Sequence, residues 1–496
     1  MTKRKKSINN IIFAIVGHIV TIAIGLILPR IFIKEYGSHI NGFINTINQL
    51  LVYLSLFEAG IGATSLQSLY KPIAEHNKEM VSSILTATKL FYKRAAFGYL
   101  ICLLFISFIF PLLIDTGFNY FSSIIIILFS GLGSVFSFQL IGHCKVLINC
   151  DGNNYILTNI SSATVLINAL LKIIFIYQKI SLPIIIVISF LIQLLQVFII
   201  YIYSKSHYRN ELNYTKPDWT ALSQKNDMLI HQISGLIFNN TDMLILSVFC
   251  GLKIVSVYSI YKLVITHIES ILSSFINGIS FVLGQLLNTN INEYAKRIDI
   301  VESYYSALAF SLFSVAYYLF IPFLNLYVDN IADINYSDKI LVILFISIAL
   351  LTATRTPMLL TINYAGHFKK TTPQTITESV INIVVSLIGV NFLGIYGVLI
   401  GTIVALLYRT NDIIIYANKK ILYRKPYITY KIYAINILLF FVTQYILNWL
   451  FSDITNISSF ILIGFCSTII SMTIFALVHT IIFSHCRLYI KKILGR

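Results

Sequence analysis

The residues of this chain that are best suited to bind a ligand or carry a proton are ionisable side chains inside long apolar stretches. Asp242, Lys262, Glu269 and Arg355 each lie well inside such a stretch, and Arg30 lies near the end of the first one. A charge at the centre of a bilayer costs about 2.5–3.5 kcal/mol on insertion scales, so such residues usually mark a substrate path, an ion path or a proton relay. We therefore take these five residues as candidates for a functional site.

Asp242 is the strongest of the five candidates for a functional role. It lies about halfway through the apolar stretch 228–250, at the end of the polar run Asn-Asn-Thr-Asp. A carboxylate at this depth that faces a cavity could bind a proton or Na⁺, or balance a nearby cation. The alternative is a structural ion pair or hydrogen bond to a neighbouring helix.

Lys262 and Glu269 lie in the next apolar stretch, 254–284, seven positions apart. Two turns of an α-helix place them on one face, about 10 Å apart along the axis. Lys262 then lies roughly 12 Å from the outer end of the helix, which is deep for a side chain that would reach the interface. A lysine there that faces water suits an anionic ligand, and the alternative is a pair with Asp242.

Arg355 and Arg30 each lie beside a proline. Arg355 precedes Pro357 in the stretch 338–365, and proline removes a helix hydrogen bond and kinks the helix. An arginine beside the freed carbonyls resembles the broken helices of transporter sites, and the alternative is an arginine that only satisfies those carbonyls. Arg30 either contacts an anion at the outer mouth of a cavity or extends its stem to the outer interface.

The elements that hold these residues are predicted from the composition. Of the 496 residues, 57% are hydrophobic and only 11% are charged, whereas a soluble domain carries roughly 25% charge. Fourteen apolar runs recur along the chain, at 11–33, 40–66, 95–114, 120–148, 155–177, 181–204, 228–250, 254–284, 304–328, 338–365, 371–393, 395–417, 431–451 and 459–485. A run of about 20 residues crosses a hydrocarbon core as a helix. The sequence therefore predicts an all-α polytopic membrane protein with about 14 transmembrane helices.

The basic residues predict the orientation in the membrane. With the N-terminus in the cytoplasm, 27 of the 36 Lys and Arg residues fall in cytoplasmic segments and four in outer loops. This bias is the positive-inside rule, and it predicts that both termini are cytoplasmic. The net charge of +16 is explained in the same way, because the basic residues set the orientation in the membrane and face anionic lipid headgroups. We therefore expect no nucleic-acid partner.

Enzymatic and metal-binding motifs are not found in the sequence. It has no Walker A sequence, no His-Glu-x-x-His spacing and no cluster of Cys and His residues. We therefore expect neither ATP hydrolysis nor a cofactor or metal.

An internal repeat with a shift of 214 positions predicts two related halves. The matched pairs are Gly37 with Gly251, Asn149 with Asn363, Gly152 with Gly366 and Asn168 with Asn382. Both members of each pair occupy the same place in two consecutive sets of six apolar runs, which is the usual build of a secondary transporter. We expect an N-lobe at 1–204, a cytoplasmic linker at 205–227, a C-lobe at 228–417, and two additional spans with a basic tail at 418–496.

The charged candidates do not follow this repeat. Lys262 corresponds to Asn48, and Arg355 corresponds to Ile141. The two lobes are thus expected to share a backbone fold, and the functional residues are expected at positions where their sequences differ.

Three stretches carry a resemblance to a known family. They read LPRIFIKEYGSHINGFINTINQLLVYLSLFEAGIGATSLQSLYKPIAEHN at 28–77, FNNTDMLILSVFCGLKIVSVYSIY at 238–261 and ESVINIVVSLIGVNFLGIYGVLIGTIVALLYR at 378–409. With the fourteen-span layout, they resemble the bacterial lipid-linked oligosaccharide flippases, the Wzx-type polysaccharide transporters of the MOP superfamily. The likeness runs from about residue 8 to residue 425.

The resemblance implies a fold and a function. The fold would be two six-helix lobes in a V around a central cationic cavity, plus two C-terminal helices. The function would be transport, not catalysis: an undecaprenyl-diphosphate-linked oligosaccharide would move to the outer leaflet of the bacterial cytoplasmic membrane for O-antigen or capsule synthesis. Polymerase or assembly proteins would be partners.

The resemblance also suggests roles for the five candidates. Arg30, Lys262 and Arg355 would contact the diphosphate or glycan. Asp242 and Glu269 would couple transport to H⁺ or Na⁺, or act as charge partners.

Two other functions are weighed against the flippase. A cation-coupled exporter of drugs or metabolites from the same superfamily should carry mid-span acids in the first, second or fourth span, and the first span here carries Arg30 and no acid. A membrane-embedded glycan polymerase usually has a large outer loop, and here each predicted outer loop has fewer than about ten residues.

Overall fold

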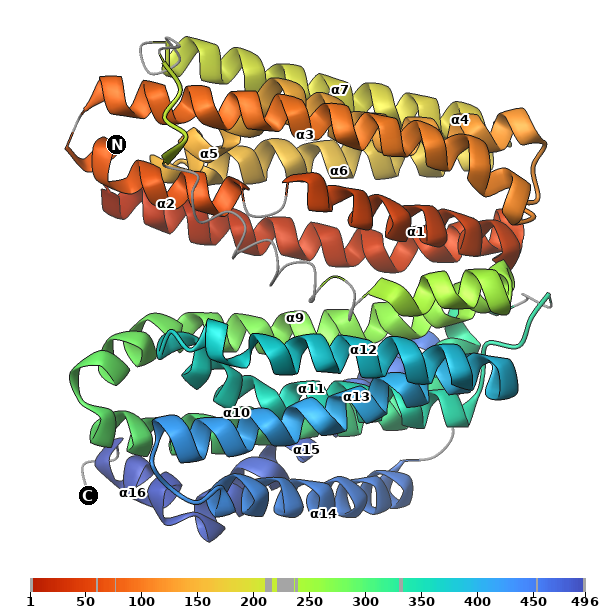
Figure 1. The fold of residues 1–496 in the computed structure, drawn as a ribbon. Helices are drawn as coiled ribbons and strands as arrows, with labels where there is room; N and C mark the ends of the chain where they lie inside the picture. The colour runs from red at the N-terminus through yellow and green to blue at the C-terminus, as the bar shows by residue number, and fades with distance from the viewer. Residues whose placement is uncertain are drawn as a thin grey trace. The chain divides into compact units, whose positions relative to one another are not determined.

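The computed structural model describes residues 3–58, 61–75, 77–209, 216–220, 236, 240–329, 333–451 and 454–493, and in these ranges every regular element is a helix. The chain divides into two compact units, Met1–Ser256 (unit 1) and Val257–Arg496 (unit 2), and each is considered by itself. Figure 1 shows the long helices of each unit side by side. The lobe boundary predicted at 205–227 stays a prediction, because most of that segment lies outside the described residues.

Unit 1 is a bundle of long helices with shorter pieces between them. In chain order its elements are α1 (Lys3–Leu54), η1 (Ser55–Glu58), α2 (Ile61–Ala74), α3 (Lys78–Leu113), α4 (Tyr120–Phe136), η2 (Ser137–Ile141), α5 (Gly142–Cys150), α6 (Asn154–Tyr177), α7 (Leu182–His207) and the short helix Asn240–Phe249. Within this unit α3 packs on α4, α4 on α7, and α6 on both α1 and α7.

Unit 2 repeats this arrangement and adds helices at its end. Its elements are α9 (Leu252–Thr289), which begins in the last residues of unit 1, then α10 (Ile291–Tyr327), α11 (Lys339–Tyr364), α12 (Phe368–Leu393), α13 (Ile395–Tyr416), η4 (Ala417–Ile421), α14 (Tyr427–Leu450), α15 (Ile457–Ile482) and α16 (Ser484–Ile493). Here α10 packs on α11, α11 on α13, and α12 on α13, as their counterparts do in unit 1.

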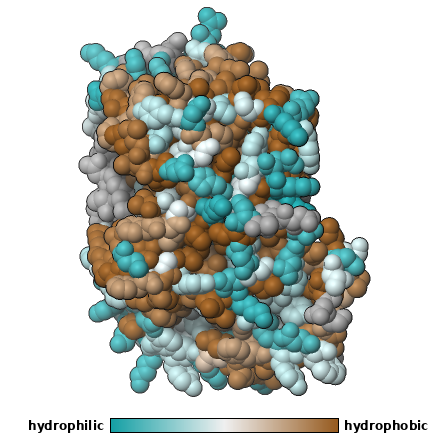
Figure 2. Space-filling model, turned by 90° about the vertical axis from the view of Figure 1, so that its right-hand side faces the viewer, coloured by the Kyte–Doolittle hydropathy of each residue, from teal (hydrophilic) through white to brown (hydrophobic). Residues whose placement is uncertain are grey.

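The helices confirm an all-α polytopic membrane protein. Among the described residues, eleven helices are long and apolar enough to cross a membrane, and they match the third to sixth and the eighth to fourteenth predicted runs. Large apolar side chains lie open on the surface, with Phe392 82% exposed and Phe121 76% exposed. Figure 2 shows such brown, hydrophobic residues over much of one face. A surface of this kind is stable in lipid and not in water.

The other three predicted runs have different outcomes, and hydropathy misplaces an end in one of them. The first two lie largely in α1, which is two helices joined at Gly37, where φ is 81° and ψ is 169°. The run predicted at 40–66 is interrupted: the helix ends at Leu54 and η1 follows, with the Ser55 hydroxyl donating to the Val52 carbonyl at 2.6 Å. This local bond competes with a continuing helix. Most of the run 228–250 lies outside the described residues.

The 214-residue repeat is confirmed in the backbone of two turns. Gly152 and Gly366 both have positive φ, at 74° and 68°. The Gly152 N–H donates to the Asn149 carbonyl at 3.0 Å, and the Gly366 N–H donates to the Asn363 carbonyl at 3.0 Å. Gly37 and Gly251 also match, with φ of 81° and 83°. Because only glycine adopts such angles readily, these pairs recur as parts of a shared frame.

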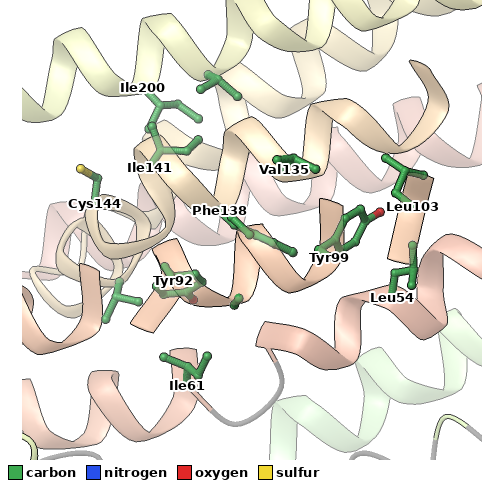
Figure 3. Packing of buried hydrophobic residues seen from close by; sticks show 14 of the residues in the cluster. Leu54, Ile61, Tyr92, Tyr99, Leu103, Val135, Phe138, Ile141, Cys144 and Ile200 are labelled. Atoms are coloured by element: carbon green, nitrogen blue, oxygen red, sulfur yellow. The ribbon is translucent and has the colours of Figure 1, made fainter. Parts of the chain in front are cut away.

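The fourth predicted span of unit 1 carries a backbone irregularity, and the fourth predicted span of unit 2 carries an internal proline close to the corresponding position of the repeat. The irregularity in unit 1 is the π-helical segment η2, whose Phe138 packs between Tyr92 and Tyr99 of α3 with ring centroids 6.2 Å and 5.6 Å away (Figure 3). The positions 214 further on are 351–355, which end at Arg355 just before Pro357 in α11. π-Segments and internal prolines both disturb the regular ladder of helix hydrogen bonds, and both are frequent at functional sites.

Candidate functional site in unit 2

The interior of unit 2 holds a network of ion pairs across three helices. Arg355 on α11 donates to the Glu378 Oε1 on α12 at 2.5 Å, and the Glu378 Oε2 lies 3.7 Å from Nε of Arg409 on α13. Arg409 also pairs with Asp412 one turn later on α13, and its Nη2 donates to the Thr375 hydroxyl at 3.0 Å. Glu378 and Arg409 are buried, at 4% and 3% exposure. The network therefore lies where water screens its charges weakly.

The part of α11 next to its internal proline presents Arg355 to this network. Pro357 cannot donate to the carbonyl of Ala353, one turn earlier. The next carbonyl, that of Thr354, accepts a hydrogen bond of 2.5 Å from the hydroxyl of Tyr433 on α14. This part of α11 is thus hydrogen-bonded to a helix of the C-terminal pair. Arg355 is bound by a carboxylate and not by freed carbonyls alone.

Lys262 and Glu269 on α9 belong to the same polar region. The Glu269 carboxylate interacts electrostatically with both Lys262 and Arg355. The Lys262 ammonium also lies 5.7 Å from the centroid of the Tyr258 ring, in the range of a cation–π interaction. The structure therefore brings Arg355 of α11 together with Lys262 and Glu269 of α9, which the sequence predicts on one face of their own helix.

The charges in this region are balanced. The cations are Lys262, Arg355 and Arg409, and the carboxylates are Glu269, Glu378 and Asp412. An anion that binds to Arg355 or Arg409 would therefore compete with Glu378 for the guanidinium groups. Such an exchange of partners is a physical way to link anion binding to the positions of α11, α12 and α13.

Arg409 is not among the residues predicted from the sequence, and Glu378 is not predicted as a partner of Arg355. Arg409 lies inside the apolar run 395–417. Its position inside a predicted span could therefore have identified it as a candidate, as it did for Arg355. The pairing with Glu378 was not visible, because it depends on how the helices are rotated about their axes.

The two candidates in unit 1 have different surroundings. Asp242 is only 4% exposed. The neighbouring Thr241 shares a hydrogen bond of 2.7 Å with the hydroxyl of Tyr53 on α1, and this hydroxyl also interacts electrostatically with Asp242. Arg30 lies exposed on α1, after the internal Pro29. Asp242 is thus an interior carboxylate, while Arg30 is available to a ligand or a lipid headgroup.

The fold and this site define a class of protein. The chain is a multi-pass helical membrane protein with the fold of the MOP superfamily. No protein-family model and no curated protein matches its sequence, so the likeness is carried by the structure.

Three solved structures illustrate the likeness. The chain is similar to a structure described as lipid II flippase MurJ in an inward closed conformation, with a TM-score of 0.64 and 16% identity, covering 95% of this chain and 99% of that one. It is similar to an inward-facing multidrug resistance MATE family transporter of the MOP superfamily, with a TM-score of 0.57 and 14% identity, covering 79% and 95%. A Vibrio cholerae MATE transporter, VcmN, matches with a TM-score of 0.52 and 13% identity, covering 83% and 95%.

Proposed function

We propose that this protein is a flippase that moves an undecaprenyl-diphosphate-linked oligosaccharide from the cytoplasmic to the outer leaflet of the bacterial cytoplasmic membrane. Its product would feed the synthesis of a surface polysaccharide such as O-antigen or capsule. The protein would act as a transporter and not as an enzyme, with the lipid bilayer and the assembly proteins of the polysaccharide as its surroundings.

The extent of the structural match to the lipid II flippase carries this proposal. The match leaves 5% of this chain uncovered. The segment 418–496 makes up a much larger share of the 496 residues than that. The match must therefore extend into the two additional spans, α14 and α15, as well as the two six-span halves. Two MATE structures, with TM-scores of 0.57 and 0.56, cover 79% and 88% of the chain. The higher TM-score and fuller coverage of the flippase match favour a carrier of a lipid-linked substrate over an exporter of small molecules.

The chemistry of the substrate suits the polar region of unit 2. A diphosphate and a hydrophilic glycan cannot cross hydrocarbon unaided, whereas a prenyl chain can stay in lipid. Lys262 and Arg355, together with Arg409, would contact the diphosphate, and Arg30 would meet it near the outer interface. Alternating access of the two lobes around a central cavity would then carry the headgroup across.

Directional transport needs a bias, and two carboxylates are candidates for it. Asp242 is buried in unit 1, and Glu269 faces two cations in unit 2. Binding and release of H⁺ or Na⁺ at either carboxylate would change the local charge during the cycle. Consumption of the product on the outer side would serve the same purpose.

Deletion of the gene with analysis of lipid-linked intermediates tests the proposed function. A flippase deletion should accumulate complete lipid-linked repeat units that face the cytoplasm. Single units already on the outer face would indicate a glycan polymerase. Normal surface glycan, with altered resistance to cationic drugs, would indicate an exporter.

Complementation of the deletion with variants tests the residues. Lys262→Ala and Arg355→Ala should each reduce glycan display while the protein remains in the membrane. Arg297→Ala is the matched control, because Arg297 forms an exposed pair with Glu293 at 3.6 Å outside the polar region. Full glycan display with both Lys262→Ala and Arg355→Ala would remove these residues from the substrate path.

A further inference from the structure

A groove on unit 1 is formed by helices that take no part in the polar region of unit 2. It runs between α3 and the α4–η2 segment and has a volume of about 480 Å³. Its walls include Lys93, Arg94, Phe97 and Leu100 from α3, Val135 from α4 and Gln139 from η2. No acidic side chain is among the described residues that line it. The groove thus combines two cations and an amide with an apolar floor.

The polar end of the groove lies at the level of a membrane interface. The apolar part of α3 that follows Arg94 runs from Ala95 to Leu113, and its 19 residues span about 28 Å as a helix. This length matches a hydrocarbon core of about 30 Å. On the other wall, Gln139 lies 19 positions after Tyr120, where α4 begins, so it is about 28 Å from the opposite end. Both walls therefore place polar groups at one headgroup layer.

A stripe of apolar side chains continues from the groove along α3. Phe97, Ile101 and Phe105 are 66%, 51% and 64% exposed and follow Lys93 at intervals of four residues. This spacing puts them on one helix face. The face thus presents a cation at the interface and an apolar track below it, which is the complement of a lipid with an anionic headgroup and an acyl chain.

The connector segment 216–220 holds Arg94 at the polar end. The Asp218 N–H donates to the Ser83 carbonyl of α3 at 3.2 Å, which fixes the segment against this helix. The Arg94 guanidinium then lies 5.3 Å from the centroid of the Trp219 ring, within the range of a cation–π interaction. Tryptophan is enriched at membrane interfaces, so this contact agrees with the depth deduced from the helix lengths.

The π-helical segment presents Gln139 to the groove. Phe138 points inward between Tyr92 and Tyr99, as Figure 3 shows, and the next side chain, Gln139, is exposed. The irregular backbone thus adds a hydrogen-bond donor to the cationic wall. An amide beside two cations suits the oxygens of a phosphodiester.

We propose that this groove binds an anionic phospholipid in the leaflet that faces the basic loops. Lys93, Arg94 and Gln139 contact its phosphate, and one acyl chain lies along Phe97, Ile101 and Phe105. This site belongs to unit 1 alone and does not depend on the proposed transport function.

Native mass spectrometry of the purified full-length protein tests the site, with phosphatidylglycerol compared with phosphatidylcholine. The protein should retain phosphatidylglycerol preferentially, and K93Q/R94Q should weaken this binding about 30-fold if each cation contributes as basic residues do at membrane surfaces. K419Q/K420Q is the matched control, because it removes two adjacent exposed lysines from η4. It should leave the binding nearly unchanged, and the charge-conserving K93R/R94K should retain it.

Two results would overturn the assignment. Equal loss in K93Q/R94Q and K419Q/K420Q would mean a general attraction of basic protein for anionic lipid, and unchanged binding in K93Q/R94Q would mean that the lipid binds elsewhere. A third arm adds undecaprenyl diphosphate. If it displaces phosphatidylglycerol from the wild type but not from K93Q/R94Q, the groove is a substrate site and the phospholipid assignment is wrong.

Discussion

The Arg355 guanidinium on α11 and the Glu378 carboxylate on α12 are joined by a hydrogen bond of 2.5 Å in the interior of unit 2. The second oxygen of the same carboxylate lies 3.7 Å from Arg409 on α13. One carboxylate thus separates two arginines that would otherwise repel each other, and it ties together three predicted spans. Any ligand that replaces Glu378 at either arginine changes the contacts among these helices.

Removal of Glu378 should destabilise unit 2. Glu378→Ala leaves the buried Arg409 and the partly buried Arg355 without this partner, and breaking a buried pair from one side costs about 3–5 kcal/mol. Arg355→Ala should cost less, because Glu378 keeps Arg409. Equilibrium unfolding of Glu378→Ala, Arg355→Ala and the variant that combines them should give a coupling energy of about 1–3 kcal/mol between the two residues. Strictly additive effects would mean that the pair makes no energetic contribution.

Gly397 on α13 should not tolerate a methyl group. A Cβ at Gly397 would lie 2.1 Å from the Gly389 carbonyl oxygen of α12, and the obstacle is backbone. Overpacking of this kind costs about 1–3 kcal/mol, so Gly397→Ala should lower the thermal midpoint. Gly464→Ala is the control, since its nearest neighbour would be the flexible Leu319 side chain at 3.4 Å. Equal midpoints for the two variants would contradict this close packing of α12 and α13.

The glycines of the repeat should respond through the backbone alone. A Cβ at Gly251 or Gly366 would meet no atom within 4 Å, but φ is 83° and 68° there. Alanine should therefore cost about 1–2 kcal/mol at each position, and asparagine should cost less because it tolerates these angles. Thermal unfolding of the alanine and asparagine variants at Gly251 and Gly366 measures this order of stability. Alanine variants as stable as the asparagine variants would show that the positive φ is not required.

Stability should fall as the solution becomes acidic, in part through His485 at the start of α16. Burial lowers the pKa of His485, against the opposing effect of the Asp299 carboxylate. The folded protein binds this proton less readily than the unfolded chain, so the contribution is complete above an unfolded pKa of about 6.5 and is lost as the pH falls through it. The imidazole Nε2 is also hydrogen-bonded to the Ser303 hydroxyl at 2.8 Å.

Thermal unfolding between about pH 7.5 and pH 5.5 checks this expectation. His485→Gln keeps a polar side chain near Ser303 and removes the titration, so its midpoint should change less with pH than that of the wild type. Parallel pH profiles for the two proteins would assign the acid sensitivity to other groups.

The helical layout could be predicted because the thickness of a bilayer limits the length of an apolar run. Eleven of the fourteen runs match described helices that are long and apolar enough to cross a membrane. The glycine pairs identified the repeat because positive φ restricts the residue type. The end of the helix at Leu54 was missed, because hydropathy continues through the break and the Ser55 hydroxyl bonds locally to the Val52 carbonyl.

The site could be predicted only in part. Depth in an apolar run identified Lys262, Glu269 and Arg355, and the structure places these three in one polar region. The partner of Arg355 could not be predicted, because Glu378 is 23 positions away and the pairing depends on the rotation of two helices. The roles of all five candidates stay predictions.

The central claim is that the protein moves a lipid-linked glycan across a membrane, and translocation in proteoliposomes tests it most directly. Purified protein would be reconstituted with a fluorescent undecaprenyl-diphosphate-linked oligosaccharide, and a membrane-impermeant reagent would report the headgroup exposed on each side. The account predicts that headgroups cross faster with the wild type than with protein-free vesicles, that Lys262→Ala and Arg355→Ala slow the crossing, and that Arg297→Ala does not. Crossing no faster than in protein-free vesicles under imposed proton and Na⁺ gradients of either sign would contradict it.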